Sequence, residues 1–181
     1  VRGHATSQGR VLARVDGQEI FTVLCALGRR SLSWAGEWAE RPDVPGPEDC
    51  PPRPLRPEHA GTIAAHLDVR AAKLRGLDDL DGTPGDGRSA LWVRNPWGTD
   101  AQAGALAIGQ ASGRRVESSS LDNTLRMVRV HPTEWILADI RVHAVADGFG
   151  HGLVHLWAQD GALIATASQS TIVREPRAPE S

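Results

Sequence analysis

Hydrophobic residues in the last third of the chain gather into runs that short turns separate. These runs are rich in Val, Ile, Leu and Trp, which favour strands. We predict four strands in this region: Leu121–Val130, Trp135–Ala144, Gly150–Ala158 and Ala162–Val173. The clearest turn is Gln159-Asp160-Gly161, because glycine tolerates the positive φ that a tight hairpin turn requires. The pattern therefore predicts a meander, in which each strand pairs with the next.

The first forty residues repeat this turn chemistry. Val11–Val15 and Gln18–Leu27 flank Asp16-Gly17 and predict another hairpin. An isolated hairpin is only marginally stable in water, so we expect these strands to need a partner: a sheet edge, a missing N-terminal segment or another subunit. Trp34 and Trp38 follow at a spacing that fits one face of a helix and equally a loop that covers a sheet edge.

A proline-rich stretch separates this hairpin from the rest of the chain. Residues 41–57 hold seven of the twelve prolines, and proline fixes φ and lacks an amide donor. We therefore predict an extended linker laid across a surface. The predicted organisation has four parts: residues 1–40, the linker 41–57, a main domain at 58–175 and a tail at 176–181.

Shorter elements are predicted between the linker and the meander. They are a short helix at Glu58–His66, strands at Leu67–Leu74 and Ser89–Arg94, and a loop at Arg75–Arg88. A longer helix is expected over the alanine-rich Ala101–Ile108, with Thr99 or Asp100 as its N-cap. Its pattern is interrupted at Gly109, Ser112 and Gly113. One helix with an antiparallel sheet predicts an α+β fold, in which the helix covers one face of the sheet.

Composition and charge argue against several classes of function. The net charge of −2 and the pI near 6.4 give no reason to expect nucleic acid as a partner, since its binding would favour a basic face. No run approaches the ~20 apolar residues of a membrane helix, so we expect no membrane partner. No Cys/His spacing resembles a zinc site, and we expect neither a metal nor a cofactor. Cys25 and Cys50 are expected to be free thiols in a reducing, cytoplasmic compartment.

Four short motifs carry a family resemblance. They are SLDNT at 120–124, EW at 134–135, QDG at 159–161 and ATASQS at 165–170. With these motifs the chain resembles the bacterial type II acyl-CoA thioesterase family, in which one polypeptide holds two hotdog domains. The first hairpin and the proline-rich linker look like the end of that family's first hotdog and its crossover. The resemblance implies a curved antiparallel sheet around a central helix at 58–175, in a double-hotdog arrangement with the first hotdog incomplete at 1–40.

The resemblance also implies a hydrolytic centre for an acyl-CoA substrate. In that family the centre combines an Asp on the second hotdog's helix, a Thr or Ser just before the SLDN-type strand, and a Gln near the last strand. Ser120 matches the hydroxyl position and Gln169 matches the glutamine. Both side chains can position a water, and a carboxylate would take its proton.

The acidic member of this centre is missing from the sequence. No carboxylate stands near Ile108–Ala111, where the family would place it. Either the protein has lost the acid, or residues are missing between Ile108 and Gly109. We expect the second case, which an intact mass above 19.4 kDa would support. Asp122 is the nearest substitute, because alternation along a strand would place it on the same face as Ser120.

Plain structural roles compete with these assignments. Gln169 also fits a solvated strand position. Ser120 also fits a loop-to-strand junction, and Asp122 fits a turn or cap. Three histidines on predicted strands are expected at half-buried or interface positions rather than as bases: His143, His151 and His155.

Two other enzyme classes are disfavoured. No G-x-S-x-G nucleophile elbow is present, which argues against a serine hydrolase of the α/β type. The Asp–His pair that an enoyl-CoA hydratase would need is not seen.

Two hypotheses of different classes follow. The first is an acyl-CoA thioesterase that hydrolyses its substrate to a free fatty acid and CoA by attack of water. The second is a catalytically silent double hotdog that binds acyl-CoA or serves as a structural partner, which the missing carboxylate favours. In both cases we expect a homo-oligomer, because exposed strand edges invite pairing.

Overall fold

The structure, a computed structural model, describes residues 6–29, 32–53, 60–94 and 101–176 of the 181-residue chain. The chain divides into two compact units, Val1–Trp38 and Ala39–Ser181. None of the helices in these described ranges is long and apolar enough to cross a membrane.

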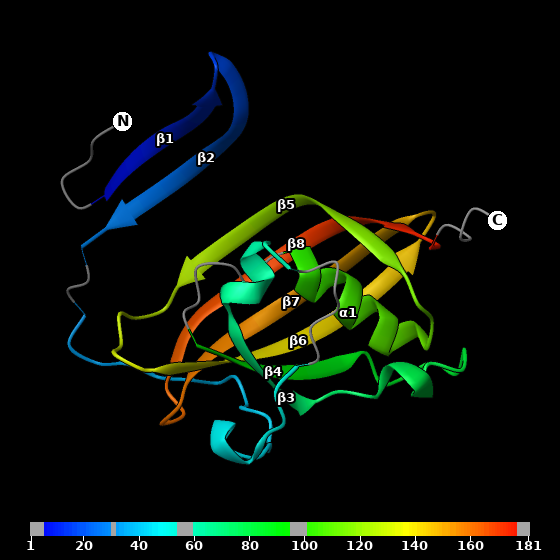
Figure 1. Cartoon of the computed structure of the whole chain (residues 1–181). Coiled ribbons are helices and arrows are strands. Elements are labelled where there is room, and N and C mark those ends of the chain that lie inside the picture. Colours follow the sequence, from blue (N-terminus) through cyan, green and yellow to red (C-terminus); the bar gives the residue numbers. More distant parts are fainter. Residues whose placement is uncertain (1–5, 30–31, 54–59, 95–100, 177–181) are drawn as a thin grey trace. The chain divides into compact units, whose positions relative to one another are not determined.

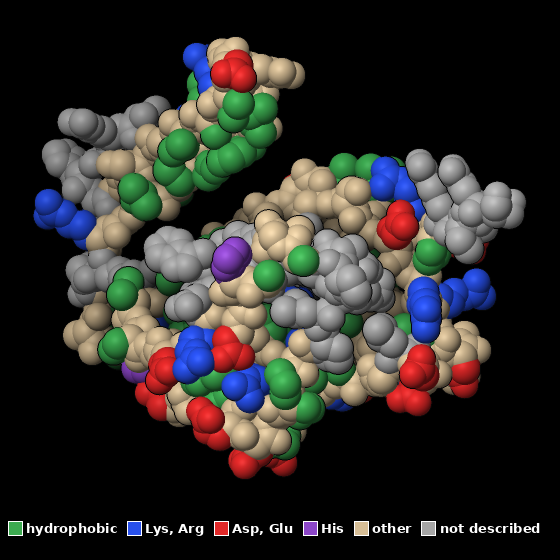
Figure 2. Space-filling view, viewed as in Figure 1, with side chains coloured by type: hydrophobic (Ala, Val, Ile, Leu, Met, Phe, Trp, Pro, Cys, Tyr) green, Lys and Arg blue, Asp and Glu red, His purple; other side chains and the backbone are tan. Residues whose placement is uncertain are grey.

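The first unit is the hairpin predicted around Asp16-Gly17. β1 (Thr6–Val15) pairs antiparallel with β2 (Gln18–Gly28). Asp16 has φ 50° and Gly17 has φ 80°, as a type I′ turn requires. Hydrophobic side chains gather along this hairpin in Figure 2. Its assignment to an incomplete first hotdog stays a prediction.

The second unit contains a six-stranded antiparallel sheet (Figure 1). Its strands are β3 (Asp68–Lys73), β4 (Arg88–Arg94), β5 (Glu117–Met127), β6 (Trp135–Ala146), β7 (Phe149–Ala158) and β8 (Leu163–Arg174). All six strands expected from the pattern are present, in the spatial order β3-β4-β6-β7-β8-β5.

The predicted four-strand meander is wrong at its first step, because β5 pairs with β8 and not with β6. The burial of the two strands matches their places in the sheet. Five of the first six residues of β6 are buried, whereas ten of the eleven residues of β5 are exposed. A strand that is apolar on both faces belongs in the centre of a sheet, and a polar one belongs at its edge.

The helix α1 (Ala101–Ser112) packs across one face of the sheet, against β4, β5 and β6 (Figure 1). The predicted helix is confirmed, but its predicted end at Ile108 is wrong. Gly109 continues the helix, which ends at Gly113, where φ is 70° and the amide N–H donates to Gly109 O at 2.9 Å. A Cβ at Gly113 would lie 2.2 Å from Thr83 O, so this helix end requires glycine.

The remaining helices are single 3₁₀ turns: η1 (Pro47–Asp49), η3 (Ile63–His66) and η4 (Leu77–Asp79). The helix expected at Glu58–His66 is represented by η3, and its first two residues lie outside the described residues. The N-cap candidates Thr99 and Asp100 lie outside them as well. Trp34 and Trp38 occur in a stretch without a helix, so the helical alternative is wrong, and a role of this loop in covering a sheet edge stays a prediction.

The proline-rich segment packs on the second unit. Arg53 N donates to Val69 O, and Ala71 N donates to Pro51 O, both at 2.8 Å, so this segment covers the β3 edge of the sheet. Cys50 from the segment joins a core on the face opposite α1. That core contains Ala90, Trp92, Trp135, Leu137, Trp157 and Leu163. A second core, of Val69, Leu91, Val93, Ala107, Ala138 and Ile140, lies beneath α1.

Candidate functional site

The pairing of β5 with β8 brings Ser120 and Gln169 together. Gln169 Nε2 donates a hydrogen bond to Ser120 Oγ, although 49 residues separate them in the sequence. Ser120 stands opposite Thr171, and Gln169 stands opposite Asn123. The two candidate residues are therefore diagonal neighbours across two strands, which long side chains can bridge.

Both residues lie on the face that α1 covers. Thr171 stands opposite Gly150 on β7. A Cβ built on Gly150 would lie 2.6 Å from Ile108 Cδ1 of α1 and 3.1 Å from Thr171 Oγ1. Thr171 therefore faces the helix. Because opposite residues share a face and residues two apart on a strand do too, Ser120 and Gln169 also face it.

Asp122 lies on the other face of the sheet, so the prediction that it shares a face with Ser120 is wrong. Ser120 pairs with Thr171, whereas Asp122 pairs with Ser170, the preceding residue on β8. The register shift between Ser120 and Asp122 marks a β-bulge, which resets the alternation of side chains. Asp122 Oδ1 accepts a hydrogen bond from Ser170 N at 2.8 Å. A catalytic role for Asp122 stays a prediction.

Gln110 occupies the stretch of α1 where an acid was expected. Its side chain is buried, accepts a hydrogen bond from Arg75 N at 2.5 Å and donates one to Arg75 O at 3.1 Å. The helix runs without a break across Ile108 and Gly109, and Ser112 Oγ donates to Ile108 O at 2.8 Å. The proposal that residues are missing after Ile108 stays a prediction, and intact mass is its test.

The three histidines occupy unequal positions. His155 is half-buried, as predicted, and its Nδ1 lies 3.9 Å from Oδ2 of the buried Asp139. Burial, followed by the charge of Arg141, lowers the pKa of His155, and Asp139 opposes this shift. His143 and His151 are exposed, and His151 Nδ1 lies 3.3 Å from Ser170 Oγ.

Two buried hydroxyl groups beside the candidate residues were not singled out from the sequence. The Oγ atom of Ser118 and the Oγ1 atom of Thr171 are buried, and neither has a hydrogen-bond partner among the described residues. Each lies two positions from a candidate residue on the same strand, Ser118 from Ser120 and Thr171 from Gln169. That spacing was the only signal available, since the strand pairing could not be read from the pattern.

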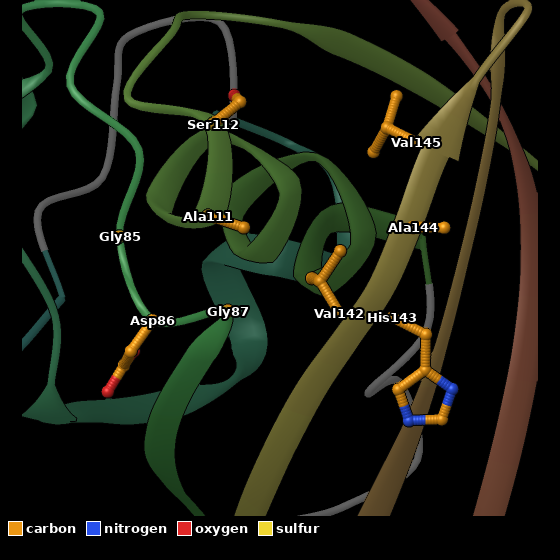
Figure 3. A pocket seen from close by; sticks show the side chains of 9 residues that line it. All are labelled: Gly85, Asp86, Gly87, Ala111, Ser112, Val142, His143, Ala144 and Val145. Carbon is orange, nitrogen blue, oxygen red and sulfur yellow. The ribbon is translucent and has the colours of Figure 1, made fainter.

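Two cavities lie near the C-terminal end of α1. The larger, about 340 Å³, is lined by the loop at Gly85, the end of the helix and β6. In Figure 3 Val142 points toward the helix, whereas His143 points away from it. The smaller, about 280 Å³, is lined by apolar residues such as Ile108 and Val173 and by charged residues such as Arg114 and Glu175. The described ranges contain no group of three or more His, Cys, Asp or Glu side chains that could hold a metal ion.

Comparison with known proteins points to one family. The family model for the acyl-CoA thioesterase C-terminal domain matches residues 47–173. A solved candidate thioesterase from Novosphingobium aromaticivorans is 34% identical, covers 96% of this chain and 70% of its own, and has a TM-score of 0.76. No curated protein matches the chain.

Two further solved structures share the fold at lower identity. A hot dog fold protein from Alicyclobacillus acidocaldarius is 23% identical, with a TM-score of 0.73 over 98% of this chain and 70% of its own. The acyl-CoA thioesterase II TesB2 from Mycobacterium marinum is 22% identical, with a TM-score of 0.66 over 97% of this chain and 71% of its own. The predicted hotdog fold is thereby confirmed.

Proposed function

The chain belongs to the acyl-CoA thioesterase C-terminal domain family, and from this premise we propose that it hydrolyses acyl-CoA to a free fatty acid and CoA. The observation that carries the proposal is the hydrogen bond between Gln169 and Ser120 on the face beneath α1. A carboxamide both donates and accepts hydrogen bonds, and so does a hydroxyl group. Together they form a cradle for one water molecule.

In the proposed reaction this water attacks the carbonyl carbon of the thioester. Gln169 and Ser120 orient it, which lowers the entropic cost of bringing the reactants together. Backbone N–H groups at the start of α1 supply partial positive charge for the oxyanion. Cleavage of the C–S bond releases CoA as thiolate, which then takes a proton.

Neither Gln169 nor Ser120 can accept the proton of the attacking water, since neither is a base at neutral pH. Gln110 presents an amide where an acid was expected. This observation favours a second candidate function, a hotdog protein that binds acyl-CoA without hydrolysing it. Catalysis would require a carboxylate from elsewhere, because Asp122, the nearest in the sequence, lies on the opposite face of the sheet from Ser120.

The test is release of free CoA from short, medium and long acyl-CoAs by wild type and Gln169→Ala. Ser168→Ala is the matched control, because Ser168 is its neighbour on β8 and faces the other side of the sheet. We expect Gln169→Ala to reduce kcat/KM by at least ~100-fold, the low end for one positioned catalytic group, and Ser168→Ala to leave it unchanged.

Other results would lead elsewhere. Equal turnover by wild type and Gln169→Ala would keep the activity and discard this site. No turnover by a preparation whose intact mass matches the sequence would favour the binding protein, and acyl-CoA binding would then be measured directly.

We also propose a homo-oligomer that works in the cytoplasm. The support for the oligomer is β5, an edge strand whose side chains are almost all exposed, since natural proteins cover or disrupt long open edges. Light scattering on the purified chain tests the oligomer, and a monomer at micromolar concentration would contradict it. Fractionation of the source cells tests the compartment.

A further inference from the structure

The helix side of β8 leads from the proposed site to the smaller cavity. Gln169, Thr171 and Val173 are successive residues on this face, about 7 Å apart. Gln169 belongs to the site, and Val173 lines the cavity of about 280 Å³. Thr171 lies between them and is only 3% exposed. The way from the site to the cavity is therefore closed at Thr171.

The side chain of Ile108 closes it. Ile108 is 4% exposed and lines the same cavity. A Cβ on Gly150, the neighbour of Thr171 on β7, would lie 2.6 Å from Ile108 Cδ1, 3.1 Å from Thr171 Oγ1 and 3.1 Å from Val173 Cγ2. The absence of a side chain at Gly150 thus lets α1 approach the sheet closely, and Ile108 stands on the sheet between the site and the cavity.

The cavity beyond Ile108 suits an alkyl chain. Its apolar walls are the side chains of Val116, Val145, Val173 and Ile108 itself, and Ser112, Arg114, Arg174 and Glu175 also line it. In the opposite direction along β8 from Gln169, the neighbouring residues of β5 on the helix side are Leu125 and Met127, which are 55% and 47% exposed. Among the described residues of the second unit, an acyl chain that ran that way would be less covered than one beneath α1, so the hydrophobic effect favours the direction under α1.

We propose that Ile108 sets the acyl-chain length that this site accepts, so that short acyl groups fit and longer ones are excluded until the cavity behind Ile108 is opened. The inference rests on the proposed function for its substrate class. About 7 Å along β8 separates Gln169 from the position that Ile108 covers, a distance comparable to the length of an extended butyryl or hexanoyl chain. A decanoyl chain needs the space beyond.

The experiment measures binding of S-butyl-, S-hexyl- and S-decyl-CoA by calorimetry, with hydrolysis of the matching acyl-CoAs in parallel. These thioethers are not hydrolysed, so the binding arm works even for an inactive protein. Wild type should bind the hexyl analogue at least about tenfold more tightly than the decyl analogue. Ile108→Ala should reverse this order, because each buried methylene then adds favourable transfer energy.

A second variant guards against a merely structural effect. Val145 is 44% exposed and lines the cavity, so Val145→Phe should fill the cavity with little effect on folding. Ile108→Ala combined with Val145→Phe should restore the preference for the shorter analogue. The ratio of two affinities in one protein does not depend on the fraction of active protein.

The outcomes separate this inference from the proposed function. If Ile108→Ala keeps the wild-type ratio, or wild type already prefers the decyl analogue, the inference is overturned even when CoA is released. If the analogues bind with the expected reversal but no acyl-CoA is hydrolysed, the inference holds and the enzyme proposal fails. If no analogue binds wild type or variant, the inference is overturned, and the enzyme proposal fails as well if no acyl-CoA is hydrolysed in the parallel assay.

Discussion

The carboxylate of Asp122 accepts a hydrogen bond from the backbone N–H of Ser170 at 2.8 Å. The bond lies next to the β-bulge that separates Ser120 and Asp122 in the β5–β8 ladder. A bulge inserts an extra residue into one strand and locally disrupts the hydrogen-bond ladder. The side chain of Asp122 therefore supplies an acceptor for the amide of Ser170, next to the point where the register of the β5–β8 ladder changes.

This relationship gives a test that separates a structural from a catalytic Asp122. Asp122→Asn keeps an acceptor oxygen for Ser170 N but cannot accept a proton at neutral pH. We expect Asp122→Asn to retain CoA release within about threefold, and Asp122→Ala to lower the free energy of unfolding by about 1 kcal/mol, the typical net contribution of one hydrogen bond. Activity assays and urea titrations measure the two quantities. A loss of ~100-fold or more in Asp122→Asn, with stability kept, would instead identify Asp122 as the base.

Much of the second unit could be predicted because its signals are local. The β7–β8 hairpin follows from Asp160-Gly161 between two apolar runs, and the structure places the turn there. The position of β5 could not be predicted in this way, since its partner strand β8 is distant in the sequence. The paired residues Asp122 and Ser170, for example, are 48 residues apart. Runs of similar composition do not state which strands pair.

The candidate site was predictable only in part for the same reason. The motifs supplied Ser120 and Gln169, but the bulge that moves Asp122 to the other face leaves no clear mark in the sequence. The end of α1 was placed too early because glycine disfavours helices. The intrinsic preference of Gly109 is outweighed by contacts between distant segments, including the bonds of Gln110 to Arg75.

Gln110 is predicted to stabilise the fold by joining α1 to the backbone at Arg75. Gln110→Leu keeps most of the side-chain volume but leaves the backbone N–H and C=O of Arg75 without this partner. Leaving a buried polar group unsatisfied costs about 1–3 kcal/mol, and these bonds are only partly buried, so we expect a loss of stability of about 1 kcal/mol in urea titrations. Gln159→Leu is the control, because Gln159 is an exposed turn residue. Equal effects of the two substitutions would contradict the proposed connection.

The two cysteines are predicted to differ in reactivity. Burial raises the pKa of the Cys50 thiol, the charge of Asp49 adds to the shift, and Arg70 opposes it. Cys50 is 4% exposed, whereas Cys25 is half-buried. Because the thiolate is the reactive form, a disulfide-exchange reagent should modify Cys25 first and Cys50 only as the protein unfolds. Peptide mapping over time measures both rates, and Cys25→Ser should remove the fast phase. Rapid modification of Cys50 in the folded protein would contradict the core position that the structure gives it.

His155 is predicted to make the fold sensitive to mild acid. Burial and Arg141 lower its pKa in the folded state, with Asp139 in opposition, while the unfolded chain keeps the ordinary value of about 6.5. The unfolded state therefore binds more protons in this window, so this stabilising contribution is present above about pH 6.5 and is lost as the pH falls through the folded-state pKa. Urea titrations at several pH values should show a smaller decline for His155→Asn than for wild type. His151→Asn, at an exposed position on the same strand, should decline as wild type does. A decline in His155→Asn as steep as that of wild type would assign the acid sensitivity to other groups.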